Sequence, residues 1–348
     1  SLCKNAGVKV KIITGDYRVT SQAILSKLGI DIRDPSKEIL EGKELGDLTE
    51  DELTRRVHAV TLFCRITPDQ KLKIVHALQR SGEVVAMTGD GVNDALALKV
   101  ADIGIVVQNA SDVAREIADL VLLDSNFHTI VSAIEEGRIM FHNIQKVVLY
   151  LLSDAFTEIC LILASILLSI PLPLTAIQIL WINIISDGFP NIALAFEPKE
   201  YSVMNHLPRN RTAPIVDSKI KRMVFVLCMA KASIALVLFL SYLQFTGNYI
   251  YAQTLTFAFI ATGSLVYAFS TRNLSRGIFK HALTKNPLLV FTVILGFLLE
   301  ILIIYHPFLQ KIFLTRALNG IDWIVILASG LLLLIISEVS KGNTANSK

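Results

Sequence analysis

The stretch that decides the fold is Met87-Thr88-Gly89-Asp90-Gly91-Val92-Asn93-Asp94. It closes the apolar run 84–87 and packs two carboxylates, an amide and two glycines into a predicted strand-to-helix turn. Carboxylates at the end of a strand suit a hard divalent cation such as Mg²⁺, which binds through one or two carboxylates together with water and phosphate oxygens. Glycines let backbone N–H groups approach an oxyanion closely. The stretch therefore predicts a site for phosphate and a divalent cation.

The segments around this stretch alternate between strand-like and helix-like sequence. Two of the helix-like segments open with capping boxes, at Thr49–Glu52 and Thr67–Gln70, the second with Pro68 at the first helical position. Alternation with near-continuous apolar strands predicts a parallel sheet covered by helices on both faces, with functional residues at the carboxyl ends of the strands. The strand-like runs are Val8–Ile13, Thr61–Phe63, Val84–Met87, Ile103–Val107 and Leu120–Leu122.

Two further polar features belong to the same predicted edge of the sheet. Thr14-Gly15-Asp16 ends the first strand-like run, and Lys71 lies near the start of the helix that follows Pro68. The Thr14 hydroxyl offers a hydrogen-bond donor and the Lys71 ammonium a point charge for phosphoryl oxygens. Taken alone, Thr14-Gly15-Asp16 favours an ordinary turn. Its position before Lys71 and the 88–94 stretch favours a phosphate site.

The 348 residues divide into two unlike parts. Residues 1–146 hold 18 Lys+Arg and 21 Asp+Glu, whereas residues 147–348 hold 15 and 9. A normally charged soluble domain is therefore followed by a long apolar region, which excludes both an ordinary soluble enzyme and a disordered chain. We expect two domains, 1–140 and 141–348. The net charge of +3 is a sum over both parts, and we expect no nucleic-acid partner.

The apolar part predicts six membrane-spanning helices, because a bilayer core needs about 20 apolar residues per helix. Lys and Arg concentrate in the loops after the second and fourth predicted spans, which places those loops, the soluble domain and both termini on the cytoplasmic side. The first residues form no apolar leader, which also favours a cytoplasmic soluble domain. The expected spans are about 147–170, 174–196, 223–245, 252–271, 288–306 and 321–338.

Polar residues inside the first two predicted spans indicate a cation site. An acidic side chain at a helix centre costs about 2.5–3.5 kcal/mol on insertion scales, and such residues usually face a cavity or an ion path. Asp154 and Glu158 are four residues apart, as are Asn183 and Asp187, so each pair shares a helix face. The expected cation ligands are Glu158, Asn183, Ser186 and Asp187, with Asp154 as a further candidate.

The chemistry of this ligand set limits the kind of ion that can bind. Carboxylate, amide and hydroxyl oxygens suit a hard cation rather than copper or zinc. Gly188 and Pro190 would loosen the second span just past Asp187 and free backbone carbonyls as further ligands. The alternative is that the same side chains only form hydrogen bonds between helices. Lys231 and Glu300, in later spans, are expected to snorkel or to be paired at span edges rather than to bind the ion.

Together these motifs resemble two families. Thr14, Lys71, Asp90 and Asp94 look like the later motifs of the haloacid-dehalogenase-type phosphotransferases. With the segment Trp181–Pro190 added, the whole chain resembles the C-terminal part of a P-type cation-transporting ATPase of the type II, calcium-pump-like kind. The resemblance implies an α/β part, the rear of a haloacid-dehalogenase-like phosphorylation domain with a doubly wound parallel sheet, followed by an all-α bundle of six transmembrane helices.

The resemblance also implies roles for single residues. Asp90 would hold Mg²⁺, while Thr14, Lys71, Gly89 and Asn93 would contact the phosphoryl group. The implied catalytic set is Thr14, Gly15, Asp16, Lys71, Asp90, Asn93 and Asp94.

The family's nucleophilic aspartate lies in an Asp-Lys-Thr-Gly sequence that these 348 residues do not contain. The chain also starts with Ser1 rather than Met. We therefore expect a fragment that is inactive alone. A preceding part of the same polypeptide would supply the nucleophile and the nucleotide-binding domain, which would make most contacts to ATP.

Calcium is the expected cargo. Asn183 and Asp187 match positions that bind the ion in calcium pumps, and Glu158 matches an acidic ligand of the preceding helix. Ala155 and Ser264 stand where two-calcium pumps place an asparagine and a glutamate, which favours one divalent ion per cycle. A pump for Na⁺ and K⁺ or for H⁺ is the alternative. A third possibility is a non-enzymatic membrane protein with a domain that senses Mg²⁺ or phosphate.

Overall fold

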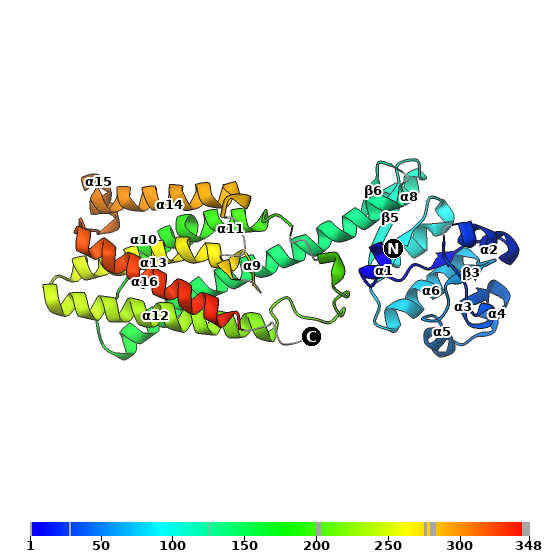
Figure 1. The fold of residues 1–348 in the computed structure, drawn as a ribbon, viewed down its shortest axis with the longest axis horizontal. Coiled ribbons are helices and arrows are strands. Elements are labelled where there is room, and N and C mark those ends of the chain that lie inside the picture. The colour runs from blue at the N-terminus through cyan, green and yellow to red at the C-terminus, as the bar shows by residue number, and fades with distance from the viewer. Residues whose placement is uncertain are drawn as a thin grey trace. The chain divides into compact units, whose positions relative to one another are not determined.

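The structure, a computed structural model, describes residues 2–27, 29–124, 126–199, 203–274, 277–278 and 283–342. The chain forms two compact units (Figure 1). The first unit comprises Ser1–Gly137 and Tyr201–Ala213, and the second comprises Arg138–Glu200 and Pro214–Lys348.

Among the described residues of the first unit, six short strands, all paired in parallel, form two three-stranded sheets. One sheet has the order β1-β3-β2 and the other β4-β5-β6, so β1 and β4 are edge strands among the described residues. The parallel pairing agrees with the sequence, but the single doubly wound sheet is not confirmed. The strands are β1 (Ile12–Ile13), β2 (Ile39–Glu41), β3 (Leu62–Cys64), β4 (Ala86–Thr88), β5 (Ile103–Val107) and β6 (Leu120–Leu122).

Short helices connect these strands. Both predicted capping boxes are present: Thr49 N–H donates to Glu52 Oε2 at 2.9 Å, and Thr67 N–H donates to Gln70 Oε1 at 3.0 Å. The helices of the first unit are α1 (Leu2–Asn5), α2 (Arg18–Lys27), α3 (Pro35–Glu38), α4 (Gly42–Asp47), α5 (Glu50–Arg56), α6 (Pro68–Arg80), α7 (Ala95–Val100) and α8 (Asp112–Ile117), with 3₁₀ turns η1 (Val92–Asp94) and η3 (Val203–Asn205).

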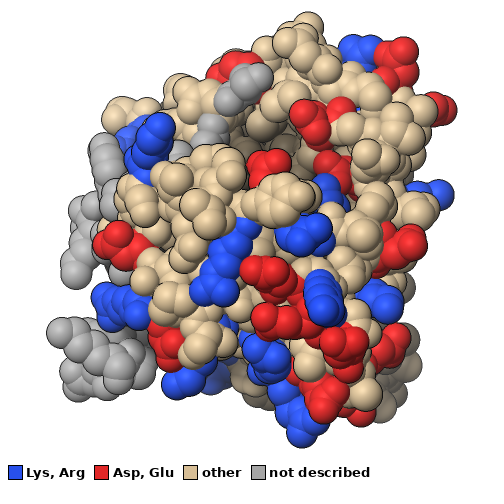
Figure 2. All heavy atoms as spheres, turned by 90° about the vertical axis from the view of Figure 1, so that its right-hand side faces the viewer, with Lys and Arg blue, Asp and Glu red and all other residues tan. Residues whose placement is uncertain are grey.

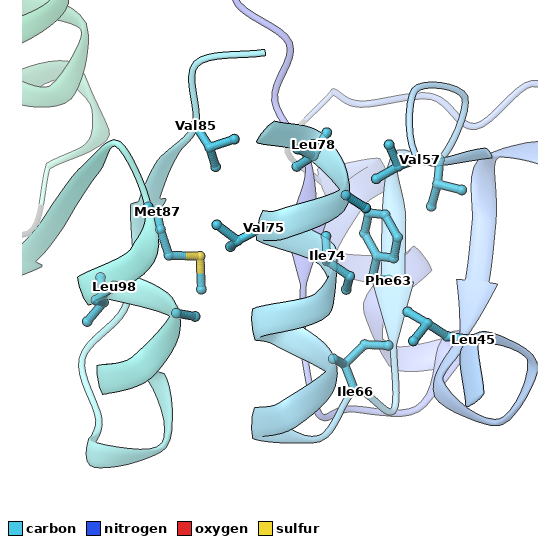
Figure 3. Close-up of a cluster of buried hydrophobic side chains, with 14 of the residues drawn as sticks. Leu45, Val57, Phe63, Ile66, Ile74, Val75, Leu78, Val85, Met87 and Leu98 are labelled. Atoms are coloured by element: carbon cyan, nitrogen blue, oxygen red, sulfur yellow. The ribbon is translucent and has the colours of Figure 1, made fainter. Parts of the chain in front are cut away.

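Helix α6 carries the core that both sheets share. Ile74 lies beside Phe63 of β3, whereas Val75 is turned toward Met87 of β4 (Figure 3). All four side chains are buried, and each buried side chain of this size stabilises the fold by about 1.5–3 kcal/mol. The two sheets are therefore held in one hydrophobic unit by a helix that presents an apolar surface to each. The outer face in Figure 2 mixes acidic and basic side chains, as a solvated surface does.

The second unit consists of helices. The long helix α9 (Phe127–Leu167) begins in the first unit and ends in the second. The other elements are α10 (Ala176–Trp181), the π-helical turn η2 (Ile182–Asp187), α11 (Gly188–Ala195), α12 (Ser218–Thr246), α13 (Tyr249–Thr271), the 3₁₀ turn η5 (Leu283–Lys285), α14 (Pro287–Tyr305), α15 (Pro307–Phe313) and α16 (Gly320–Ser340).

Five helices in the described part of the chain are long and apolar enough to cross a membrane. They are His128–Leu167 and the helices α12, α13, α14 and α16. The most apolar window of α13 is 89% buried, against 28–44% for the other four, so α13 is the central helix of the bundle. The predicted span 174–196 is not among the five, because α10, η2 and α11 follow one another as a helix with a π-helical interruption. The expected count of six spans is therefore not confirmed.

Candidate functional site

The turn after β4 brings Asp94 and Lys71 together. Asp94 closes the 3₁₀ turn η1 and is 8% exposed, and the Lys71 ammonium of α6 forms an ion pair with its Oδ1. Gly89 makes this arrangement possible. A Cβ atom at residue 89 would lie 2.7 Å from Asp94 Cβ and 2.8 Å from Asp94 Oδ2, closer than such atoms approach one another. The predicted glycine requirement thus has a steric cause in this turn.

The other side chains of the turn are open to solvent. Asp90 and Asn93 are exposed, and the backbone carbonyl of Asp90 accepts a hydrogen bond from Ser111 N–H at 3.0 Å. This bond anchors the backbone at the end of β4 while the Asp90 carboxylate stays free for a ligand. An exposed carboxylate at a strand end is an oxygen donor that fits Mg²⁺, which takes one or two protein carboxylates and otherwise water and phosphate.

The segment Thr14–Asp16 belongs to the other sheet, β1-β3-β2. Thr14 N–H donates to Phe63 O at 2.9 Å, and Thr14 O accepts from Ile66 N–H at 3.0 Å, so residue 14 continues the pairing of β1 with β3. The Thr14 hydroxyl accepts from Asp16 N–H at 3.1 Å. Within the described ranges, no hydrogen bond or ion pair joins residues 14–16 to residues 89–94. The structure therefore brings Lys71, Gly89 and Asp94 together, and leaves the Thr14 segment on the other sheet.

The predicted cation ligands gather where η2 meets α9. Asn183 Nδ2 donates to Glu158 Oε2 at 3.1 Å and to Ile179 O at 3.0 Å. Ser186 and Asp187 are each 1% exposed, yet Ser186 Oγ and Asp187 Oδ1 have no hydrogen-bond partner. Buried polar atoms are almost always paired, so two oxygens without a partner on consecutive residues of η2 are free to bind a ligand that accepts their lone pairs. A hard cation is such a ligand.

The π-helical turn has a local cause. Pro190 lacks an N–H group, so it cannot donate to the carbonyl of Ser186, four residues earlier, and its ring would clash with that carbonyl in a regular α-helix. The chain widens over η2 instead, and the freed Ser186 carbonyl accepts a hydrogen bond from Tyr150 OH of α9 at 3.0 Å. Tyr150 is in turn stacked on Tyr267 of α13, with ring centroids 5.0 Å apart. A π-helical turn of this kind often marks a functional site.

Both ends of the interrupted helix are tied to the bundle. At the α10 end, Gln178 Nε2 donates to Phe313 O at 3.0 Å. At the α11 end, Glu197 accepts from Arg272 Nε at 2.9 Å and from Asn286 Nδ2 at 2.7 Å. Asn143 of α9 also donates to the Glu197 carbonyl at 2.8 Å. The irregular backbone of η2 is thus fixed by contacts on either side of it.

Asp154 has a different partner from the other predicted ligands. Lys231 Nζ of α12 lies 2.5 Å from Asp154 Oδ1 and 2.5 Å from Ser264 Oγ of α13. Lys231 is 2% exposed, so it is paired as expected, but in the interior of the bundle rather than at a span edge. Residue 231 lies 13 positions into α12, at about 1.5 Å per residue some 20 Å from the start of that helix.

Glu300 is also buried inside the bundle rather than exposed at its edge. It is 0% exposed, and its carboxylate accepts hydrogen bonds from Thr262 Oγ1 at 3.0 and 3.2 Å. Among the described residues, no group of three or more His, Cys, Asp or Glu side chains has the geometry of a metal site. The candidate cation site therefore rests on mixed oxygens, two of them carboxylates, one an amide and one a hydroxyl.

Sequence comparisons connect both sites with known families. The profile described as "Cation transporting ATPase, C-terminus" matches residues 171–342. Two profiles described as "haloacid dehalogenase-like hydrolase" match residues 1–102 and 71–134. The first match contains the interrupted helix, and the other two contain the turn after β4.

Similar proteins are calcium pumps by name. The "Calcium-transporting ATPase" of Bacillus subtilis is 40% identical over 327 residues, which are 93% of this chain and 36% of that protein. "Calcium-transporting ATPase 1" of Bacillus cereus is 36% identical over 97% of this chain and 40% of that protein. "Calcium-transporting ATPase type 2C member 1" of Bos taurus is 37% identical over 97% of this chain and 35% of that protein. The chain thus spans about two fifths or less of the length of these relatives.

Proposed function

The chain belongs to the P-type cation-transporting ATPases, and we propose that it provides the ion-binding helices and part of the phosphoryl-handling domain of an ATP-driven Ca²⁺ pump. The observation that carries the proposal is the pair of buried oxygens without partners, Ser186 Oγ and Asp187 Oδ1, in the same π-helical turn as Asn183, which donates to Glu158. The names of the similar proteins support calcium as the cargo.

At the cation site, the predicted ligands supply oxygens from α9 and from a helix whose regular hydrogen bonding is interrupted by η2. Glu158 and Asp187 supply negative charge, and Asn183 and Ser186 supply neutral oxygens. The hydrogen bond from Tyr150 to the Ser186 carbonyl keeps the π-helical turn in place, so these side chains remain on the side of α9. Ca²⁺ accepts six to eight oxygens in flexible geometry, which suits a mixed set of this kind better than Mg²⁺.

At the phosphoryl site, the chain supplies fixed charges and donors. Asp94 holds the Lys71 ammonium by one of its three donors, which leaves the others for phosphoryl oxygens. Gly89 lets the backbone N–H approach a phosphoryl oxygen closely. The Thr14 hydroxyl and the Asn93 amide offer further contacts to the phosphoryl group, and Asp90 would hold Mg²⁺. When bound, Mg²⁺ neutralises part of the charge on the transferred phosphoryl oxygens. Such pre-placed groups act by electrostatic stabilisation and need no rearrangement during the reaction.

The phosphorylated aspartate would come from elsewhere. These 348 residues contain no Asp-Lys-Thr-Gly sequence, so we expect them not to form an aspartyl phosphate by themselves. The remaining part of the pump would also supply most contacts to ATP. In the complete pump we propose that β1–β6 belong to one doubly wound sheet, and that α10, η2 and α11 together form a sixth membrane span. With six spans, the soluble domain and both termini of the chain would then lie on the cytoplasmic side.

Equilibrium binding of ⁴⁵Ca²⁺ to the purified chain in lipid nanodiscs tests the proposal. Asp187→Asn should weaken Ca²⁺ binding by at least about 100-fold, because even the loss of a group that only orients a ligand costs about 10- to 100-fold. Glu300→Gln is the matched control: it removes a buried carboxylate of another span and should leave binding unchanged.

Two results would contradict the proposal. One is unchanged Ca²⁺ affinity in Asp187→Asn. The other is a wild-type chain that binds Na⁺, K⁺ or neither instead of Ca²⁺, which would favour the pump for monovalent cations.

A further inference from the structure

Lys231 forms a closed polar triangle with Asp154 and Ser264. Its ammonium lies 2.5 Å from Asp154 Oδ1 and 2.5 Å from Ser264 Oγ, and Ser264 Oγ donates to Asp154 Oδ2 at 3.2 Å. The three residues come from three helices, α12, α9 and α13. The side chains of Lys231 and Asp154 are 3% and 1% exposed. The triangle therefore lies in the interior of the helix bundle and is not a solvent-exposed ion pair.

The surroundings fix the ammonium in this place. Residue 231 is 13 residues from the start of α12 and 15 from its end, so at about 1.5 Å per residue both ends are some 20 Å away. A lysine side chain cannot reach solvent over that distance. A charge buried so deeply in a membrane helix must be paired, and the loss of one partner leaves an uncompensated charge.

The ammonium is held by the kind of groups that also bind a hard cation. Its partners are a carboxylate oxygen of Asp154 and the hydroxyl of Ser264, and both are hard oxygen donors. The position also adjoins the candidate cation site, because Lys231 and Asp154 both lie within electrostatic range of Glu158 and Asp187. Residue 154 is one helical turn before residue 158 on α9.

Charge balance then limits the number of ions. Among the described residues, the carboxylates of Asp154, Glu158 and Asp187 lie within electrostatic range of one internal cation, the Lys231 ammonium. Lys231 compensates Asp154, and the remaining two carboxylates match the charge of one divalent ion. A second divalent ion would have to displace an ammonium that is covalently part of α12.

We propose that the Lys231 ammonium fills a second cation position, formed by Asp154 and Ser264, and thereby restricts the site to one divalent ion. The inference rests on the proposed function and deepens it, because it assigns the ion stoichiometry to a residue. Lys231 is in this view a specificity-determining residue that touches no cargo ion. A lysine that only connected three helices by hydrogen bonds would have no effect on the number of Ca²⁺ ions bound per chain.

The test is the number of Ca²⁺ ions bound per chain at saturation, measured with ⁴⁵Ca²⁺ in nanodiscs. The wild type should bind a single ion. Lys231→Met removes the ammonium, exposes Asp154 and Ser264 to a cation, and should bind a second ion. Lys231→Arg keeps the positive charge and should bind only the first. Methylammonium, a free ammonium probe, should compete with the second ion in Lys231→Met and have no effect on the wild type.

The outcomes separate the two proposals. A single bound ion in both the wild type and Lys231→Met overturns this inference and leaves the proposed function standing. A wild-type chain that binds no Ca²⁺ overturns both. To secure a folded variant, Lys231→Met is purified with Ca²⁺ or with methylammonium. Recovery that depends on either cation supports the inference. Failure to fold in both would mean that no other cation can replace the ammonium, and would contradict it.

Discussion

Gly89 determines the geometry of the turn after β4 although it has no side chain. Residue type and spacing were enough to predict that residues 89–94 form a turn after a strand, because glycine and short polar side chains are typical of such turns. The partner of each carboxylate was not predictable. Lys71 pairs with Asp94 and not with Asp90, since Asp94 is the one that η1 turns inward and buries. That choice depends on the 3₁₀ turn, which the sequence does not specify.

Gly89→Ala should disrupt the Lys71–Asp94 pair. The added methyl would lie 2.7 Å from Asp94 Cβ, and overpacking of this kind costs about 1–3 kcal/mol. Hydrogen exchange of the 88–98 segment, followed by mass spectrometry on the whole chain, should speed up accordingly. Gly91→Ala is the matched control, because its Cβ meets nothing closer than 3.9 Å. Equal exchange in the two variants would show that the close approach at residue 89 is not required.

Lys11 should titrate far below an ordinary lysine. Its ammonium donates to the carbonyls of Val57 at 2.7 Å and Val60 at 2.5 Å, and burial, followed by repulsion from Lys9, lowers its pKa from 10.5 to about 8. Because the folded-state pKa lies below the unfolded one, the cost of burying this charge is fully present below pH 8. It is relieved as the pH rises toward 10.5.

Competitive acetylation as a function of pH measures this pKa. Glu83 raises the pKa of Lys11 and Lys9 lowers it, so Glu83→Gln should shift the midpoint of labelling down and Lys9→Met should shift it up. A midpoint near 10.5 in the wild type, or shifts of the same sign in both variants, would refute the assignment.

At the scale of elements, the sequence was most reliable where a local signal acts alone. The capping boxes at Thr49 and Thr67 were predicted and found, because a cap needs only residues within one turn. Strand β2 (Ile39–Glu41) was not predicted, since only two apolar residues, Ile39 and Leu40, stand there between charged ones and form no apolar run.

The sequence predicts that the second span is loosened just past Asp187, at Gly188 and Pro190. In the structure the irregular backbone lies upstream of that point, over η2 (Ile182–Asp187). The proline acts on the carbonyl four residues earlier, so its effect appears upstream of its position.

Pro190→Ala tests whether this proline maintains the π-helical turn. Alanine restores an N–H group that can donate to the Ser186 carbonyl, so η2 should revert toward a regular α-helix and turn Asn183 and Asp187 away from Glu158. We expect at least a tenfold loss of Ca²⁺ affinity, from displaced ligands, in a chain that stays folded and helical by circular dichroism.

Pro214→Ala, a proline outside the helices, is the control and should bind as the wild type does. Full Ca²⁺ affinity in Pro190→Ala would show that the ligands do not depend on the interruption.

At the scale of the whole molecule, charge distribution and hydropathy predicted two parts, and the structure forms two compact units. The unit division is not linear in sequence, because Tyr201–Ala213 belongs to the first unit. Within that unit, Arg211 forms an ion pair with Asp102 at 2.6 Å. A contact between residues so distant in sequence cannot be read from composition. The same reason explains why the interior position of Lys231 became clear only once α9, α12 and α13 were placed together.

The central claim is that oxygens of the interrupted helix and α9 hold a single Ca²⁺. An anomalous-difference map from crystals of the chain grown with Ca²⁺ tests it most directly. We expect a single peak within about 2.3–2.6 Å of Asp187 Oδ1 and Ser186 Oγ, with Glu158 in its coordination shell, and no peak between Lys231 and Asp154. A peak at Asp154 and Ser264, or none at Asp187 under saturating Ca²⁺, would contradict it.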